Sequence, residues 1–185
     1  MPPRQKPSTV VGRSDRLKAD DFVNELINTR HLRDMTETCK VVTRLSESND
    51  TSMYYLEEKG TPYVLRTYNS GVNREYAMLQ QDLLKHIDNP EGKAHPGCEA
   101  VYFIALPVGW AIHSGKKGLV FRYAKPLRDA RQPTTSDRAQ VQDQIEFLLW
   151  LGYMPMDVSD HNILLADQNR CYLMNHNSVC KTGQA

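Results

Sequence analysis

Three polar side chains near the carboxyl end of the chain have the types and the spacing that phosphoryl transfer requires. Asp157 and Asn162 are five residues apart, and Asn175 follows them after a segment with the pattern strand, turn, strand. Phosphoryl transfer needs a carboxylate beside the attacking hydroxyl, and oxygen ligands that hold a metal ion on the nucleotide phosphates. We therefore assign Asp157 as the candidate catalytic base, and Asn162 and Asn175 as candidate metal ligands.

The same residues also have a plainer interpretation. Asp and Asn are common in tight loops because their short side chains hydrogen-bond to nearby backbone groups. Asp157 and Asn162 would then only shape the loop between a helix and a hairpin. Asp160, two residues before Asn162, is a further acidic side chain that could supply charge to a metal ion. These interpretations stay open at the level of the sequence.

Hydrophobic periodicity predicts the elements that hold these residues. Apolar side chains at helical spacing predict three helices, over 19–34, 73–86 and 136–151. Apolar runs between turn-forming residues predict strands over 40–45, 53–58, 63–68, 100–107, 118–123, 162–165 and 171–174. The order indicates a mainly β first half with an inserted helix, then a connector, a helix and a hairpin.

The helix over 136–151 has the clearest boundaries. Ser136 is a suitable N-cap because its hydroxyl can accept a hydrogen bond from a free backbone N–H, and Gly152 suits the C-cap. The expected buried stripe consists of Val141, Ile145, Leu148 and Leu149. This helix leads into the loop that carries Asp157.

The order and spacing of these pieces resemble the protein kinase-like superfamily, which includes protein kinases, aminoglycoside phosphotransferases and choline kinases. In that superfamily a loop of the form HxDxxxxNIL precedes a strand and then the triplet D-F-G or D-F-E. The corresponding segments here are PMDVSDHNILL and NHN. The segment VVTRLSESNDTSMYYLEEKGTPYVLRTYN is similar to the first three strands of the small lobe, and the resemblance covers about residues 38–180.

The resemblance implies an α+β fold of the kinase-like, two-lobed type with a reduced C-terminal lobe. Its parts would be a disordered basic tail over 1–16, a β-sheet lobe with helices over 17–124, and a truncated lobe over 125–185. The chain ends ten residues after Asn175, so the family's activation segment and substrate platform are expected to be missing.

The resemblance also implies a set of nucleotide-binding residues. Arg66, in VLRTYN, would be the cation at the phosphates, and Glu75, in NREYAML, the acid that steadies it. In LVFRYAKPL, which resembles the hinge, Phe121 would be the gatekeeper, and the backbones of Arg122 and Ala124 would face an adenine. The plainer alternatives are an ordinary strand ion pair for Arg66 and a helix-dipole preference for Glu75.

Several positions depart from the family pattern. The expected glycine-rich turn reads SESNDTS, with no glycine and two acids that would repel a triphosphate. Pro155 replaces the catalytic-loop His, and Asn175 replaces the metal-binding Asp. A neutral amide binds Mg²⁺ more weakly than a carboxylate does. These departures weaken both the phosphate site and the metal site.

The departures favour a pseudokinase with weak or absent ATP binding, acting as a protein-interaction or regulatory module. The alternative is a minimal active kinase, which would use ATP and Mg²⁺ and transfer the γ-phosphate to a protein or small-molecule hydroxyl. A third interpretation is a subunit whose missing part is supplied by another chain. The expected partner is a protein, with a nucleotide as a second ligand.

Composition excludes other classes of function. Lys and Arg number 23 against 22 for Asp and Glu, so the excess of basic residues that nucleic-acid binding needs is missing. No apolar run approaches the ~20 residues of a membrane helix. The four cysteines show no CxxC spacing, and the histidines show no zinc-ligand grouping. We expect a cytoplasmic protein, or an exported effector that acts in a host cytoplasm.

Overall fold

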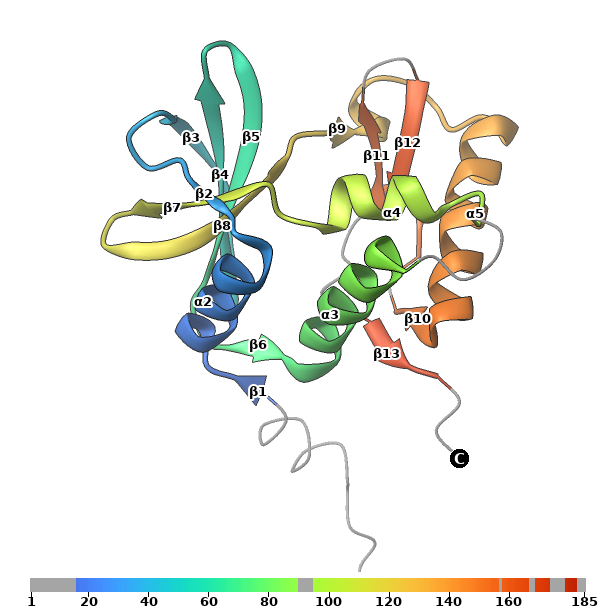
Figure 1. The fold of residues 1–185 in the computed structure, drawn as a ribbon. Helices are drawn as coiled ribbons and strands as arrows, with labels where there is room; N and C mark the ends of the chain where they lie inside the picture. The colour runs from blue at the N-terminus through green and yellow to red at the C-terminus, as the bar shows by residue number, and fades with distance from the viewer. Residues whose placement is uncertain (1–15, 90–94, 157, 167–168, 174–178, 183–185) are drawn as a thin grey trace, which may run out of the picture.

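The computed structural model describes residues 16–89, 95–156, 158–166, 169–173 and 179–182 of the chain. It contains four α-helices within these residues: α2 (Ala19–Arg30), α3 (Arg74–Asp88), α4 (Cys98–Ala105) and α5 (Thr135–Leu151). Two short 3-10 helices are η1 (Leu127–Asp129) and η2 (Asp160–Asn162). Helices and strands make up similar shares of the fold, and the strands form several sheets (Figure 1), so the expected α+β class is confirmed.

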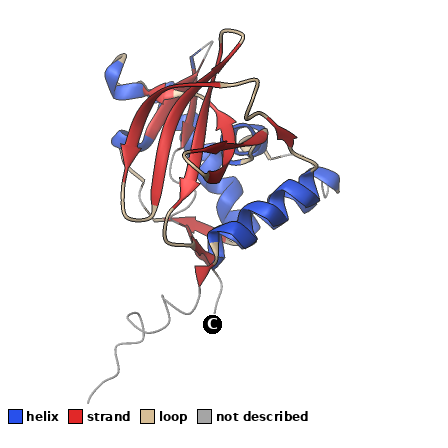
Figure 2. Cartoon of the chain, turned by 90° about the vertical axis from the view of Figure 1, so that its left-hand side faces the viewer, coloured by secondary structure: helices blue, strands red, loops and turns tan. Residues whose placement is uncertain are grey.

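A six-stranded sheet fills the first half of the chain (Figures 1 and 2). Its order is β2 (Arg33–Asp34), β7 (Gly109–His113), β8 (Lys116–Arg122), β5 (Thr61–Tyr68), β4 (Thr51–Glu58) and β3 (Lys40–Glu47). Only β2 and β7 pair in parallel. The three predicted strands of the meander β3–β4–β5 are therefore confirmed, each two residues longer than expected. Chain reversal at Gly60 uses a left-handed φ of 83°, which glycine adopts without a steric cost.

The two faces of this sheet bury different side chains, because strand residues alternate in direction. Leu65 and Val120 pack on one face with Met35. Tyr68 and Phe121 pack on the other face, where α2 and α3 cover them. α2 presents its own apolar stripe to this face, and the stripe consists of Phe22, Val23 and Leu26. The helix-covered face is also the face that carries Arg66, two residues before Tyr68.

The segment expected to be a strand over 100–107 is the helix α4, so that prediction was wrong. The run CEAVYFIA is short and apolar, and periodicity alone does not separate a buried helix from a buried strand in such a run. Val101 and Ala105, four residues apart, both face the core in the helix. The strand that follows, β7, was not predicted.

α5 confirms the predicted helix but corrects two details. Its N-cap is Thr134, whose hydroxyl accepts from the Asp137 N–H in a capping box, and not Ser136. Gly152 ends the helix with φ 98°, as expected. Leu149 is 41% exposed, and Phe147 is fully buried in its place. The buried face is rotated toward α3 and α4, whose His86 and Tyr102 contact the Phe147 ring.

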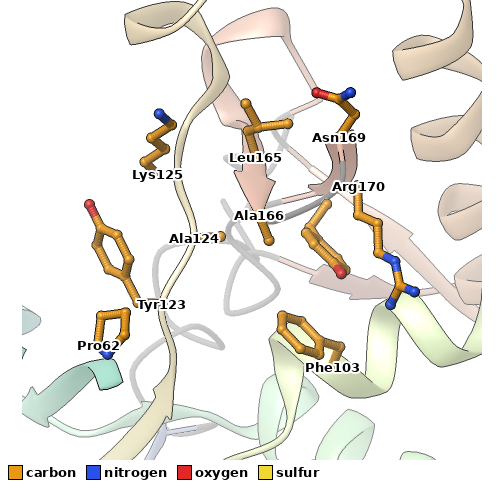
Figure 3. Close-up of a pocket in the computed structure, with 10 residues that line it drawn as sticks. Pro62, Phe103, Tyr123, Ala124, Lys125, Leu165, Ala166, Asn169 and Arg170 are labelled. Carbon is orange, nitrogen blue, oxygen red and sulfur yellow. The ribbon is translucent and has the colours of Figure 1, made fainter. Parts of the chain in front are cut away.

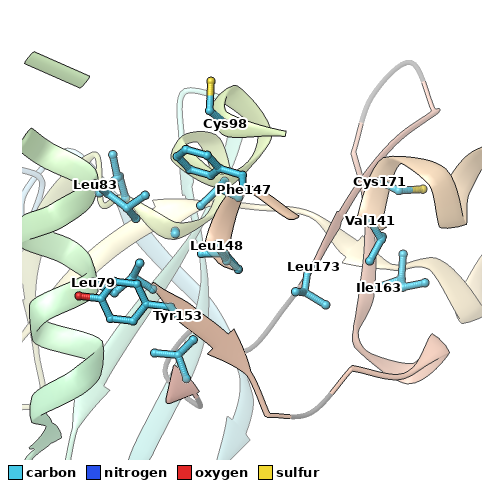
Figure 4. Close-up of a cluster of buried hydrophobic side chains, with 14 of the residues drawn as sticks. Leu79, Leu83, Cys98, Val141, Phe147, Leu148, Tyr153, Ile163, Cys171 and Leu173 are labelled. Carbon is cyan, nitrogen blue, oxygen red and sulfur yellow. The ribbon is translucent and has the colours of Figure 1, made fainter. Parts of the chain in front are cut away.

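The second hydrophobic core joins α3, α4, α5 and a hairpin (Figure 4). The hairpin strands are β11 (Ile163–Ala166) and β12 (Arg170–Leu173), which confirms the predicted pair. The residues fully or almost fully buried in this core include Leu79, Leu83, Val101, Phe147, Leu148, Tyr153 and Leu173. The core therefore draws on segments from residue 79 to residue 179.

Short strands tie the remaining segments together. β9 (Lys125–Pro126) adds to β11, and β10 (Tyr153–Pro155) pairs with β13 (Val179–Lys181). β1 (Arg16–Leu17) pairs with β6 (Val72–Asn73). Arg16 thus belongs to a strand, and the rest of the expected tail, 1–15, lies outside the described residues. Figure 1 shows α3 and α4 between the large sheet and the hairpin.

Candidate functional site

Arg66 and Phe121, both predicted nucleotide-binding residues, lie together on the helix-covered face of the sheet. The Arg66 guanidinium carbon is 5.6 Å from the centre of the Phe121 ring. Arg66 Nη2 donates to the sulfur of Met53 at 3.7 Å. The Nε atom of Arg66 is buried and has no hydrogen-bond partner among the described residues. The half-buried cation therefore forms no ion pair with a described carboxylate.

The hydroxyl of Tyr68 is a second buried donor on the same face. Tyr68 is 7% exposed, and its hydroxyl makes no hydrogen bond with the part of the chain that the structure describes. Burial raises the pKa of this phenol well above its ordinary value. The ring is fixed by an edge-to-face contact with Phe22, 5.5 Å between ring centres. Tyr68 therefore presents a neutral donor beside Arg66.

Glu75 does not approach Arg66. Its Oε2 atom accepts a hydrogen bond of 2.6 Å from the backbone N–H of Lys181 in β13. The first turn of α3 is fixed by its cap, because Asn73 Oδ1 accepts from the Glu75 N–H at 2.8 Å. Neither an ion pair nor a hydrogen bond joins Glu75 to Arg66. The predicted pairing of these two residues is therefore not formed.

Lys181 makes further contacts that bind β13 to α3 and β10, and we call this set the Lys181 clamp: Glu75, Asp82, Tyr153 and Lys181. The Lys181 ammonium lies 3.6 Å from Asp82 Oδ2 and 4.5 Å from the centre of the Tyr153 ring. The Tyr153 hydroxyl donates to the same Asp82 oxygen at 2.5 Å. Burial, and then the carboxylate of Asp82, raise the pKa of Tyr153. No sequence pattern had indicated the last three residues.

Asn162 is the one predicted metal ligand that the structure describes. It is 7% exposed at the end of η2, and its Nδ2 atom lies 3.5 Å from Ser159 Oγ. Asp157 and Asn175 lie outside the described residues, so the predicted catalytic and metal set stays a prediction. Asp160 forms an exposed ion pair with Arg138 at 3.4 Å. Within the described residues no group of three or more His, Cys, Asp or Glu could hold a metal ion.

The turn between β3 and β4 is built from side-chain hydrogen bonds instead of glycines. The hydroxyl of Ser48 accepts from the backbone N–H groups of Asp50 and Thr51. Asp50 Oδ1 accepts from the Ser70 hydroxyl at 2.6 Å and pairs with Arg16 at 3.0 Å. These two contacts hold the pKa of Asp50 below its ordinary value. An ionised carboxylate is therefore fixed at the turn.

The two predicted hinge residues lie at the end of β8 and in the connector that follows it, residues 123–126. Arg122 is the last residue of β8, and Ala124 belongs to the connector. The Arg122 guanidinium carbon lies 4.9 Å from the centre of the Phe103 ring, and Nη1 donates to the Phe103 carbonyl at 3.3 Å. Ala124 lines a cavity of about 610 Å³ between the connector and the hairpin (Figure 3). Ala124 is the only predicted site residue in its lining. Phe103 also lines it, and was missed because its segment was expected to be a strand.

Comparison with known proteins adds no family. No protein-family model and no curated protein sequence matches the chain. Among the helices of the described residues, none has the length and apolar character needed to cross a membrane.

Proposed function

We propose that this chain is a kinase-like protein without efficient phosphoryl transfer, which acts as a protein-interaction or regulatory module and binds ATP weakly or not at all. The order of its elements supports the kinase-like part. A meander β3–β4–β5 precedes α3, β8 leads into the connector, and α5 precedes η2 and the hairpin β11–β12. That order is the one in which the family's small lobe, hinge and catalytic loop follow one another.

The observation that carries the loss of activity is the position of Glu75. In active protein kinases the phosphate-binding cation and the acid of the following helix must pair before phosphate is transferred. Here the carboxylate of Glu75 is bound to the Lys181 backbone N–H, 2.6 Å away. Arg66 therefore lacks the partner that would orient it toward a phosphate.

The turn between β3 and β4 supports the same conclusion. A triphosphate covered by this turn would face the ionised Asp50 instead of glycine backbone N–H groups. The carboxylate of Asp50 and the phosphates are both negative, so they repel each other whatever the effective dielectric constant. The described residues do not fit a metal–triphosphate, and we assign no phosphoryl-transfer step to this chain.

Exposed apolar side chains support the interaction part of the proposal. They lie at the end of α5 and in the segment that follows it, and are Leu149, Trp150, Met154, Met156 and Val158. Each of these side chains is between 41% and 59% exposed. A protein partner that covers this stretch of the chain would bury apolar surface, which favours association.

A thermal-shift titration with ATP tests the proposal. A nucleotide at 100 times its dissociation constant stabilises by about 2.7 kcal/mol, which would raise Tm by roughly 5–10 °C. We expect a shift below about 1 °C at millimolar ATP, with or without Mg²⁺ or Mn²⁺. Micromolar affinity that depends on a divalent ion would overturn the proposal.

One observation favours a minimal active kinase as the second candidate. Arg66 Nε and the Tyr68 hydroxyl are two buried donors without described partners, on one sheet face. Buried donors are normally satisfied, so an anion is a suitable partner for them. The test is transfer of the labelled γ-phosphate of ATP to any acceptor, with Asp157→Asn as the matched control. Transfer that this substitution abolishes would establish the second candidate.

A further inference from the structure

The cavity beside the connector has walls that are already fixed by contacts with other side chains. The Phe103 ring is stacked on Tyr172, with ring centres 4.9 Å apart and planes 17° apart. Its surroundings also include the Arg122 guanidinium, 4.9 Å from the ring centre. Tyr123 is held by an edge-to-face contact with Tyr55 at 5.0 Å. A ligand entering here would meet aromatic walls that need little reorganisation, which reduces the entropic cost of binding.

The described lining of the cavity is positively charged. Lys125 and Arg170 belong to it, and none of its ten described residues is acidic. Neither cation forms an ion pair with another described residue. Arg170 also borders a neighbouring hollow that contains Glu99 and Asp143, but it pairs with neither of them. Lys125 is opposite Leu165 and Arg170 is opposite Ala166, so the two cations lie on opposite faces of the sheet β9–β11–β12. Arg170 is therefore the cation available to an anionic group on the face that carries Tyr172.

The size and the remaining lining suit a small molecule. Pockets of 300–1,000 Å³ with mainly apolar walls and a few polar groups are typical of small-ligand sites, and this cavity measures about 610 Å³. Leu165 and Ala166 of β11 supply apolar surface next to the aromatic rings. In the view of Figure 3, Phe103 and Arg170 lie on the hairpin side of the connector, and the side chains of Tyr123 and Lys125 lie on its other side.

The cavity shares one residue, Ala124, with the nucleotide site that the kinase resemblance implies. The other described residues of that site, which include Arg66, Phe121 and Asn162, are not part of its lining. Arg66 and Phe121 lie on the face covered by α2 and α3, whereas the cavity is lined by α4, the connector and the hairpin. An occupant of the cavity would therefore not need to contact the predicted phosphate cation.

We propose that this cavity is a binding site for a small aromatic acid, whose ring packs against Phe103, Tyr172 and Tyr123 and whose acid group is bound by Arg170. The ring of the ligand contributes to binding because its apolar surface is buried. The acid group of the ligand accepts hydrogen bonds from a guanidinium, which are stronger than those between neutral groups. The site does not depend on whether the chain transfers phosphate.

The test uses 1-naphthyl phosphate as the probe and the backbone amide signals of the isotope-labelled chain as the readout. We expect saturable shifts at Ala124, Ala166 and Arg170, with a dissociation constant of about 1 mM or tighter. Neutral 1-naphthol and inorganic phosphate alone should each bind at least about tenfold more weakly. Shifts centred on Arg66 and Phe121, displaced by ATP, would place the probe in the nucleotide site and overturn the proposal.

Two substitutions separate this site from general anion binding. Arg170→Gln should weaken binding of the probe about tenfold, because it removes a charged donor from an exposed position that does not support the fold. Arg44→Gln, which removes an exposed cation from β3, should leave the affinity within about twofold. Equal effects of both substitutions, or no effect of Arg170→Gln, would overturn the assignment.

Discussion

The side chain of Gln144 accepts a hydrogen bond from the backbone N–H of Leu173, at 2.9 Å, inside the second core. The same amide group donates to the Cys171 carbonyl at 2.8 Å. Gln144 is 1% exposed. One side chain of α5 therefore binds β12 in the way that a neighbouring strand would.

Replacing this amide should destabilise the fold. Gln144→Leu leaves the backbone groups of Leu173 and Cys171 buried without their partners, which costs about 2–4 kcal/mol in the free energy of unfolding. Urea denaturation at neutral pH measures it. The control is Gln142→Leu on the exposed side of the same helix, which should change stability by less than about 0.5 kcal/mol. Equal effects at the two positions would contradict the role of Gln144.

Asp137 should make stability depend on acid pH. The hydrogen bond from Arg131 lowers the pKa of Asp137 below its ordinary value. Burial acts in the opposite direction, but the bonds from Arg131 and from the Thr134 N–H outweigh it. A carboxyl group with a depressed folded pKa stabilises the fold above its unfolded pKa of about 4, and this contribution is lost as the pH falls below that value.

Asp137→Asn should therefore be less stable than the native chain at pH 7, and the difference should shrink as the pH falls from 5 to 2. Chemical denaturation at a series of pH values measures both curves. Glu146→Gln, on the exposed face of the same helix, should follow the native curve. A gap between the native chain and Asp137→Asn that stays constant with pH would exclude the proposed linkage.

The Lys181 clamp predicts energetic coupling between α3 and β10. Tyr153→Phe removes the hydroxyl that donates to Asp82, and should lower the free energy of unfolding by about 1–2 kcal/mol. A double-mutant cycle with Asp82→Asn isolates the contact, and we expect a coupling of about 1 kcal/mol. Additive effects of the two substitutions would show that the contact contributes nothing to stability.

Asn175→Asp tests whether the kinase resemblance assigns this position correctly. A carboxylate binds Mg²⁺ more strongly than an amide, so the substitution should create nucleotide binding that depends on the metal. Transfer of phosphate should stay poor, because Glu75 remains bound to β13. Calorimetric titration with ATP, with and without Mg²⁺, measures the effect. An affinity unchanged by Asn175→Asp would remove position 175 from the metal site.

Local sequence patterns were sufficient to predict most helices and strands, but they were insufficient to predict the contacts of the candidate site. α5 and the strands β4 and β5 were predictable because the caps, turns and apolar periodicity lie within each segment. α4 was missed because its eight residues are apolar on most sides, and its helical state depends on packing against α5. The site depends on contacts between distant segments. Nothing near Glu75 in the sequence indicates that its partner is the backbone of Lys181.

The contact between Glu75 and Lys181 joins residues that are 106 positions apart. Loop closure over such a distance must be completed before the contact contributes any free energy, and native contacts of this kind slow folding. The strands of the meander β3–β4–β5 are close in the sequence, so they can pair before this contact forms. The bond from Lys181 to Glu75 can form only after residue 181 has been synthesised, whereas the cap of α3 at Asn73 uses neighbouring residues. The first turn of α3 is therefore fixed in two stages, first by its own cap and later by β13.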